Sequence, residues 1–157
     1  MSVQESKREI AVQSVMQRHP VAIHEAETVQ EAVDKMTEHH IAALPVVDDG
    51  GYLKGLVTIS DLLRLVQDAE RTLESDLAIY DDGLIVADMI RQCLGTDQVA
   101  DVMSGMPITV SQDESLKQVA KLMIEHQVHH ILVVGADRKL LGLVSSIDFV
   151  RLTADSV

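Results

Sequence analysis

Two segments of the chain place a hydroxyl residue three positions before an aspartate, where a strand pattern passes into a helix pattern. They read GLVTISDLLRL at 55–65 and GLVSSIDFVRL at 142–152. A carboxylate at the start of a helix can accept both hydroxyls of a ribose, while the hydroxyl residue and the helix amides attract phosphate. An aspartate in this place can also simply cap its helix. The spacing therefore predicts either sugar-phosphate sites or helix caps at four residues, namely Thr58, Asp61, Ser145 and Asp148.

These segments belong to a longer internal repeat. Residues 15–65 overlay residues 102–152 at a constant shift of 87 positions, and 16 of the 51 aligned positions are identical. Unrelated segments of ordinary composition would agree at roughly three positions. The chain is therefore predicted to contain two similar units.

Both copies predict the same order of elements, which is strand, helix, strand, strand, helix. The first helix of each copy opens with a capping-box pattern, Thr28 to Glu31 and Ser115 to Gln118. Because one copy cannot cover all its apolar faces, we expect an α/β fold of the α+β type, with the copies packed as a pseudo-two-fold pair through their sheets. The expected strands are 20–23, 43–47 and 52–58 in the first copy, and 107–110, 131–134 and 139–145 in the second.

The segments outside the repeat are polar or acidic. Nine acids and two arginines at 67–101 contribute −7 to the formal net charge of −12, and such a bias is typical of a solvated face. Val86, Met89, Ile90, Cys93 and Leu94 recur at helical offsets within this linker and predict an amphipathic helix. We expect a short helix within 10–16 as well. The predicted domains are a tail at 1–10, a repeat at 11–66, an acidic helical linker at 67–101, a repeat at 102–153 and a tail at 154–157.

The composition argues against several kinds of partner. A net charge of −12 and an aromatic content of 2% oppose nucleic acid binding, because phosphate backbones are anionic and bases stack on aromatic rings. The single cysteine, Cys93, excludes an internal disulfide, so we expect a reducing cytoplasm as the location. No apolar run approaches the roughly 18 residues of a membrane span, so no membrane partner is expected.

The sequence carries no pattern of a known catalytic centre. It has no nucleophile elbow, no GxxxxGK[ST] phosphate loop and no close pair of carboxylates. His39, His40 and His126 end the predicted first helices, but no thiolate pair or HExxH spacing accompanies them. We therefore expect neither an enzyme, nor a metal site, nor a required cofactor.

Both copies resemble CBS motifs, which are named for cystathionine beta-synthase, and the tandem resembles a CBS domain pair or Bateman module. The resemblance covers residues 11–153 apart from the acidic linker, and it rests on the order, duplication and spacing of the motifs together. Its strongest marks are LPVVD at 44–48, the two glycine-to-aspartate turns, Met16 with Pro20 and Met103 with Pro107.

The resemblance implies a sensor of adenosine nucleotides. In this family the pair encloses a cleft with two symmetry-related sites, whose ligands include AMP, ADP, ATP and S-adenosylmethionine. The matching positions imply that Asp61 and Asp148 bind ribose, with Thr58 and Ser145 near ribose and phosphate. Adenine would be held by backbone and apolar side chains of the outer strands and by the starts of the central strands, at Val21, Ala22, Ile23, Ile108, Thr109, Val110 and Ala43.

The copies diverge immediately before the central strand. The first has Ala42 and Ala43, whereas the second has His129 and His130. In the related gamma subunit of the AMP-activated protein kinase, a basic His-Arg pair at the matching places contacts phosphate. The two histidines could do the same near or below their ordinary pKa of about 6.5, which predicts tighter phosphate binding in mild acid and a better site at Asp148. Alternatively, they are a turn histidine and a half-buried one.

Three classes of function remain. The first is a regulatory module that senses an adenosine nucleotide in the cleft and passes its state to an unidentified partner protein. The second is a constitutive homodimerisation module without a ligand, since members of the family often form disk-like dimers. The third is an enzyme of unrecognised type. Ligand-dependent stability separates the first class from the second.

Overall fold

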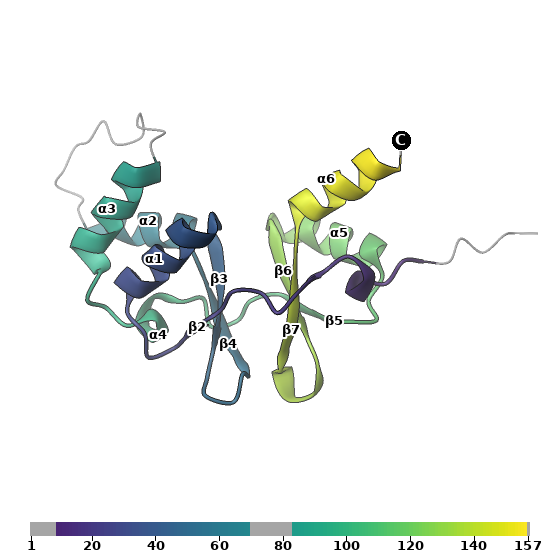
Figure 1. The fold of residues 1–157 in the computed structure, drawn as a ribbon, viewed down its shortest axis with the longest axis horizontal. Helices are drawn as coiled ribbons and strands as arrows, with labels where there is room; N and C mark the ends of the chain where they lie inside the picture. The colour runs from purple at the N-terminus through teal and green to yellow at the C-terminus, as the bar shows by residue number, and fades with distance from the viewer. Residues whose placement is uncertain (1–8, 70–82, 157) are drawn as a thin grey trace, which may run out of the picture. The chain divides into compact units, whose positions relative to one another are not determined.

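The computed structural model describes residues 9–69 and 83–156, which form two compact units. The first unit comprises described residues from Val21 to Pro107, and the second comprises those up to Pro20 together with those from Ile108 onward. Each unit has one sheet with helices packed on it, so the predicted α/β fold class is confirmed (Figure 1). Five acids of the expected linker, between positions 70 and 82, lie outside the described residues.

The first unit contains a three-stranded sheet in the order β2-β3-β4. Strand β2 runs parallel to β3, and β4 runs antiparallel to it. The predicted helix in the linker is confirmed as α3, which packs on α1 and α2. The elements are β2 (Ile23–His24), α1 (Val29–His39), β3 (Ala43–Val47), β4 (Leu53–Thr58), α2 (Ile59–Ala69), α3 (Gly83–Leu94) and α4 (Val99–Val102).

The second unit contains a four-stranded sheet in the order β1-β7-β6-β5. Strand β5 runs parallel to β6, and β7 runs antiparallel to both β6 and β1. The short helix predicted within residues 10–16 is a 3-10 helix, η1. The elements are η1 (Val12–Ser14), β1 (Gln17–Arg18), β5 (Thr109–Ser111), α5 (Leu116–His126), β6 (His130–Val134), η3 (Ala136–Arg138), β7 (Leu140–Ser145) and α6 (Ser146–Asp155).

The outer strands begin later than the sequence predicts. In the second unit the Leu132 N–H donates to the Ile108 carbonyl at 3.2 Å, and the ladder continues from there. The matching residue of the first copy is Pro45, which has no N–H to donate. Strand β2 therefore begins one position later in the repeat than β5 does, at Ile23, and it is shorter than β5.

The N-terminal caps of α1 and α5 follow their predicted patterns to different extents. The Thr28 hydroxyl accepts from the Glu31 N–H at 3.3 Å, and the Thr28 N–H donates to the Glu31 carboxylate at 2.8 Å, so this capping box is complete. The Ser115 hydroxyl accepts from the Gln118 N–H at 3.1 Å. The Ser115 N–H donates instead to the Glu114 carboxylate, so only half of the second box forms.

The segment before the outer strand of each copy, which we call the lead-in (residues 11–20 and 98–107), packs on the other copy. Gln17 pairs with Leu143 of β7, and the matching residue Ser104 forms a bridge with Leu56 of β4. The Val12 N–H donates to the Glu114 carbonyl at 2.7 Å, and the Val99 N–H donates to the Glu27 carbonyl at 2.8 Å. The two copies have therefore exchanged equivalent segments, residue for residue.

This exchange explains the glycine in each strand before the aspartate turn. A Cβ atom on Gly55 would lie 2.5 Å from the Ser104 carbonyl oxygen, and one on Gly142 would lie 2.6 Å from the Met16 sulfur. Any side chain here would force the incoming segment away. The two glycines therefore permit the close approach of the exchanged lead-in.

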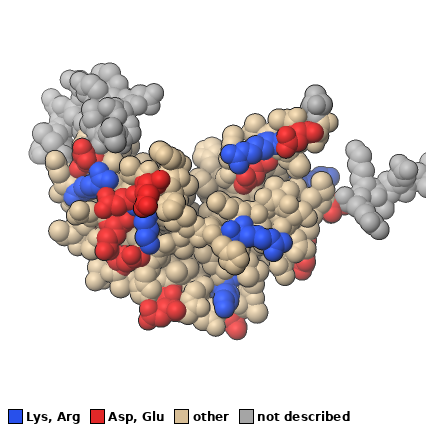
Figure 2. All heavy atoms as spheres, viewed as in Figure 1, with Lys and Arg blue, Asp and Glu red and all other residues tan. Residues whose placement is uncertain are grey.

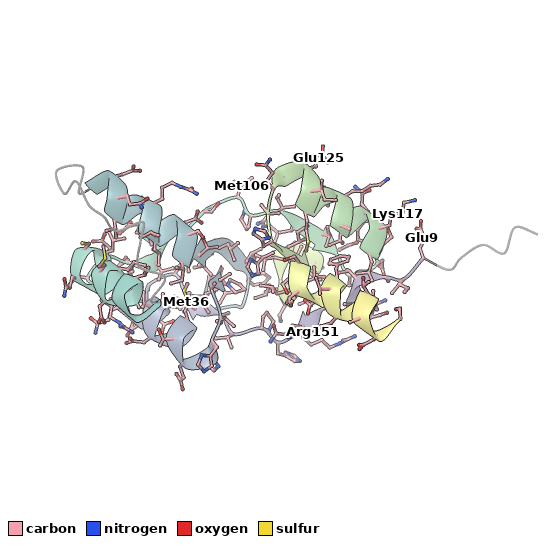
Figure 3. All side chains as sticks on the ribbon, turned by 90° about the horizontal axis from the view of Figure 1, so that it is seen from above. Glu9, Met36, Met106, Lys117, Glu125 and Arg151 are labelled. Carbon is pink, nitrogen blue, oxygen red and sulfur yellow. The ribbon has the colours of Figure 1, made fainter. Side chains whose placement is uncertain are left out.

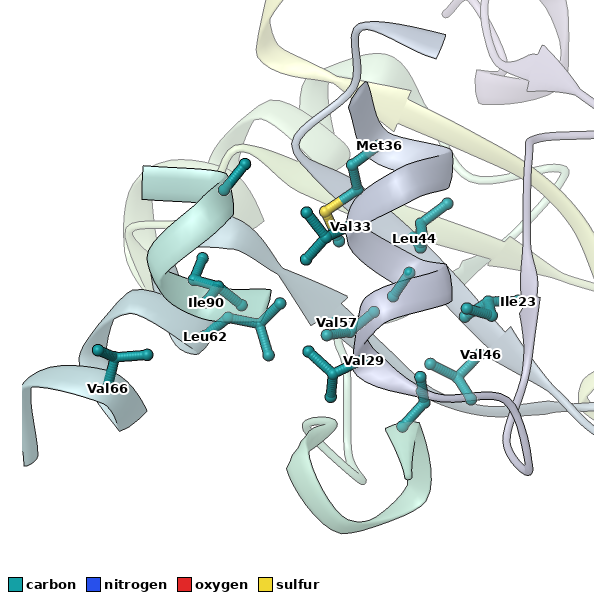
Figure 4. Packing of buried hydrophobic residues seen from close by; sticks show 13 residues of the cluster. Ile23, Val29, Val33, Met36, Leu44, Val46, Val57, Leu62, Val66 and Ile90 are labelled. Atoms are coloured by element: carbon teal, nitrogen blue, oxygen red, sulfur yellow. The ribbon is translucent and has the colours of Figure 1, made fainter. Parts of the chain in front are cut away.

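Each unit has its own apolar core. In the first unit the core lies between the sheet and the three helices α1, α2 and α3 (Figure 4). Leu62, Val66 and Ile90 are each at most 1% exposed there, because α3 covers the surfaces of α1 and α2. The core of the second unit includes Val12 and Met16 of the exchanged lead-in. None of the described helices is long and apolar enough to cross a membrane.

Candidate functional site

The turn between β7 and α6 holds its aspartate against its own main chain. The Asp148 carboxylate accepts from the Ser145 N–H at 2.8 Å and from the Ser145 hydroxyl at 3.1 Å. The Asp148 side chain is 17% exposed. In this copy the carboxylate therefore caps α6, as one of the two sequence interpretations expects.

The turn between β4 and α2 has the same two residue types with a different arrangement of hydrogen bonds. The Thr58 hydroxyl accepts from the Asp61 N–H at 3.1 Å, so the hydroxyl makes the cap. The Asp61 carboxylate lies 3.5 Å from Arg64 Nη1, and its side chain is 36% exposed. A ligand can reach the Asp61 carboxylate without displacing a main-chain hydrogen bond, whereas at Asp148 it would compete with the Ser145 N–H.

A pocket of about 220 Å³ opens beside Asp61. Part of its wall is the exchanged lead-in, because Ser104 and Leu56 exchange two main-chain hydrogen bonds of 2.8 and 3.0 Å. The residues that line it are Asp61, Arg64, Leu65, Asp68, Val102, Met103 and Ser104. Among them the sequence predicted only Asp61 as a ligand-binding residue, and the glycine at position 55 was the one sign that another segment must lie close to this strand.

The structure brings three predicted residues together in each copy. Strand pairing places Ala43 opposite Thr58, and it places His130 opposite Ser145. Each of these pairs lies at the turn that carries the aspartate of its copy. The Ile59 N–H donates to the Ala42 carbonyl, and the Ser146 N–H donates to the His129 carbonyl, so the residue before each central strand is fixed in the same way.

Of the predicted adenine residues, Ala43 begins β3 and the other six lie on β2 and β5 or just before them. Ile23 is 1% exposed and Val110 is 6% exposed, so these side chains pack in the cores. Val21, Ala22, Ile108 and Thr109 are half-buried. Because β2 and β5 are the end strands of their described sheets, one edge of each main chain has no strand partner there. Any contact to a flat base at Ile23 or Val110 is therefore a main-chain contact.

The two histidines of the second copy differ in environment. His129 is exposed and His130 is half-buried. Burial lowers the pKa of His130 below its ordinary 6.5, and the neighbouring His129 lowers this pKa further, while Asp148 acts in the opposite direction. His130 is therefore neutral at pH 7 before any anion binds.

Cationic side chains accompany both aspartates. Arg151 Nη1 lies 3.7 Å from the Asp148 carboxylate and Arg64 Nη1 lies 3.5 Å from that of Asp61, and both arginine side chains are at least 70% exposed. Arg138 and Lys139 lie at the other end of β7 from Ser145. Across residues 9–69 and 83–156 there is no group of three or more His, Cys, Asp or Glu side chains that could hold a metal ion.

The fold and the paired turns define a tandem of two related repeats, and comparison with known proteins identifies the repeat. The CBS domain model matches residues 12–68 and 99–155, so the chain belongs to the CBS domain family. It is 30% identical over 129 residues to the chloroplastic CBS domain-containing protein CBSX1 of Arabidopsis thaliana, covering 79% of this chain and 55% of that protein.

Solved structures show the same fold. The crystal structure of CBSX2 in complex with AMP matches with a TM-score of 0.71 and 26% identity, over 93% of this chain and 97% of that chain. The CBS domain pair of protein MJ0100, in complex with 5'-methylthioadenosine and S-adenosyl-L-methionine, matches with a TM-score of 0.71 and 24% identity, over 95% and 99%. Some curated relatives are longer: this chain spans 55% of CBSX1 and 23% of L-aspartate semialdehyde sulfurtransferase of Methanocaldococcus jannaschii, to which it is 25% identical.

Proposed function

We propose that this CBS domain pair is a regulatory module that binds an adenosine nucleotide at its strand-to-helix turns. The observation that supports this most is the Asp61 carboxylate, which stands 36% exposed beside a pocket of about 220 Å³. The AMP complex of CBSX2, which is 26% identical to this chain, supports the same class of ligand. The module binds without turning the ligand over, and it needs no cofactor.

Each part of the ligand has its own partner in this proposal. The Asp61 carboxylate accepts hydrogen bonds from the two ribose hydroxyls, and Thr58 lies near the ribose and the phosphate. The unpaired edge of β2 receives the adenine through main-chain groups. In the second copy Asp148 and Ser145 take the same roles, after Asp148 releases or shares the Ser145 N–H.

The charge around the first pocket selects among adenosine ligands. Two carboxylates, of Asp61 and Asp68, line the pocket with one cation, Arg64. A triphosphate adds several negative charges to a site that is already negative, and like charges repel. We therefore propose that AMP or S-adenosylmethionine binds the first site more tightly than ADP or ATP does.

The second site differs because His129 and His130 replace the two alanines. Phosphate beside these residues favours the protonated imidazoles, because opposite charges attract. The second site is therefore proposed to accept more phosphate charge, and to do so better in mild acid.

A panel of ligands tests the function. A ligand at 100 times its dissociation constant stabilises a protein by about 2.7 kcal/mol. For a chain of this length that raises the melting temperature by about 5 to 10 °C. We expect this shift with AMP or S-adenosylmethionine, a smaller one with ATP at pH 8, and none with GMP. If no adenosine ligand shifts the melting temperature, nucleotide sensing is wrong.

In this proposal the bound nucleotide changes the conformation of the module, and a partner protein in the cytoplasm recognises that change.

A second candidate function, constitutive homodimerisation, is favoured by one observation. Ile124, Ile147 and Val150 are 79%, 50% and 59% exposed, although they are large and apolar.

A further inference from the structure

Another pocket lies in the second unit, at the end of its sheet that is away from the aspartate turn. It has a volume of about 380 Å³, and residues 109–113 and 134–136 line it. Ser111, at the end of β5, pairs with Val134, at the end of β6. Val134 is four residues from His130, which corresponds to about 13 Å along a strand. The pocket is therefore separate from the strand-to-helix turn, which lies at the His130 end of β6.

In the first unit, two side chains meet at the matching place. The constant shift of 87 positions relates Ser111 to His24 and Ala136 to Asp49. His24 Nε2 is buried and lies 2.7 Å from Asp49 Oδ1, close enough for an ion pair although the two groups lack the alignment of a hydrogen bond. The Ala26 N–H donates to His24 Nδ1 at 3.1 Å and so fixes the ring. The first copy thus places an imidazole where the second copy, with serine and alanine, leaves a pocket.

The wall of this pocket offers polar groups to a ligand. Within the part of the chain that the structure describes, none of the side chains of Thr109, Ser111 and Asp113 makes a hydrogen bond or an ion pair. Thr109 and Ser111 are two residues apart on β5, so their hydroxyls lie on the same face of the strand. Sites for small molecules usually have volumes of about 300 to 1,000 Å³. The pocket is therefore suited to a small, polar molecule.

The charge of the wall favours a cation. Asp113 is the one ionised side chain among the residues that line the pocket. Lys117, Arg138 and Lys139 are exposed and do not line it, and Figure 3 shows Lys117 on the outside of the unit, near the start of α5. The chain has a formal net charge of −12, and acidic atoms gather over the region of α1 and α3 in Figure 2. Such a protein attracts cations and repels anions.

We propose that this pocket binds a small molecule that carries both an imidazole ring and a cationic amine. The ring takes the place that the His24 ring has in the first copy, and its N–H donates to the hydroxyl of Thr109 or Ser111. The ammonium group pairs with the Asp113 carboxylate. The site does not depend on the proposed nucleotide function, because neither Ser111 nor Asp113 is a predicted nucleotide residue.

The internal repeat supplies variants for the test. Ser111→His with Ala136→Asp installs the pair of the first copy and fills the pocket. His24→Ser with Asp49→Ala changes the matching positions of the first copy and is the control. Asp113→Asn keeps the shape of the pocket and removes its charge. Histamine is the probe, and imidazole-4-acetate is the matched probe with the same ring and the opposite charge on its side chain.

Amide NMR spectra of the isotope-labelled chain at pH 7.5 locate and measure the binding, and they also verify that each variant is folded. We expect histamine to shift the amides of residues 111–113 and 135–136 to saturation, with AMP present or absent. Imidazole-4-acetate should bind at least about threefold more weakly, because the charge on Asp113 attracts one probe and repels the other across an exposed pair. Asp113→Asn should remove this difference.

The filled variant, Ser111→His with Ala136→Asp, should bind histamine at least about tenfold more weakly, because its own side chains occupy the site. The control, His24→Ser with Asp49→Ala, should keep the wild-type affinity at residues 111–113. Absence of these shifts in the wild type, equal affinity for the two probes, or wild-type affinity in the filled variant would overturn the proposal. Displacement of histamine by AMP would do so too, since it would make the pocket part of the nucleotide site.

Discussion

The two aspartates occupy matching places in the repeat, yet their hydrogen bonds differ. The Asp148 carboxylate binds the Ser145 main chain, whereas at Asp61 the cap runs from the main-chain N–H to Thr58. Removing the Asp148 carboxylate would therefore cost a cap, typically about 1 kcal/mol, as well as a ligand contact. Removing the Asp61 carboxylate leaves its cap in place. Asp61 is consequently the position where binding can be tested with the smaller loss of stability, since its carboxylate pairs only with the exposed Arg64.

His130 makes stability depend on pH in a defined direction. Its pKa is lowered in the folded protein, by burial first, then by His129, against the opposing effect of Asp148. The unfolded chain therefore binds a proton at this residue more readily than the folded protein does. The free energy of unfolding should fall as the pH drops below 6.5 toward the lowered pKa, and it should be unaffected by this residue above 6.5.

Urea unfolding at pH 7.5 and pH 5.5 measures this dependence. His130→Ala installs the residue that the first copy has at the matching position, and we expect it to lose less stability between the two pH values than the wild type does. His126→Ala, which removes an exposed histidine, is the control and should keep the wild-type dependence. An unchanged dependence in His130→Ala would contradict the role of burial at this residue.

Sequence reasoning reached the turn residues but not their hydrogen bonds. A hydroxyl residue three positions before an aspartate is compatible with both a cap and a sugar site. The residue types do not determine which of the two side chains accepts a hydrogen bond from the main chain. Thr58 and Ser145 differ by one methyl group, and that difference does not predict the different hydrogen bonds of the two turns. The environment of His130 likewise depends on what packs around the start of β6.

At the scale of elements, most of the fold could be predicted. The apolar periodicity of α1 and α5 and the short apolar runs of β3 and β6 follow directly from the sequence. The exchange of lead-in segments could not be predicted, because the repeat aligns each lead-in with its own copy. Only Gly55 and Gly142 indicated a close neighbour, and they did not indicate which segment supplies it.

Alanine in place of these glycines tests the exchange. On Gly55 the added Cβ would lie 2.5 Å from a main-chain oxygen, which cannot easily move, whereas on Gly142 it would lie 2.6 Å from the flexible end of Met16. We expect Gly55→Ala to destabilise by about 1 to 3 kcal/mol and Gly142→Ala by less. Urea unfolding gives both values.

Gly105→Ala is the control for these changes, because nothing lies within 4 Å of the added atom. Its free energy of unfolding should stay within about 0.5 kcal/mol of the wild-type value. A Gly55→Ala variant as stable as Gly105→Ala would mean that residues 102–104 do not lie against β4.

At the scale of the whole molecule, the duplication has produced two units that are alike in fold and different in surface. The first unit is acidic and carries the covering helix α3, while the second is nearly neutral and lacks such a helix in its described residues. The first unit also has the aspartate that stands open beside a pocket. We therefore assign ligand binding at neutral pH chiefly to the first unit.

Calorimetric titration of AMP at pH 7.5 into the wild type, Asp61→Ala and the surface control Glu38→Ala tests the nucleotide assignment most directly. Hydrogen bonds to a charged group contribute about 1.5 to 3 kcal/mol each, so the loss of the Asp61 carboxylate should weaken binding at the first site at least tenfold. Glu38→Ala, which removes an exposed acid of α1, should bind as the wild type does. Equal AMP affinity in Asp61→Ala and the wild type would contradict the assignment of the ribose to this turn.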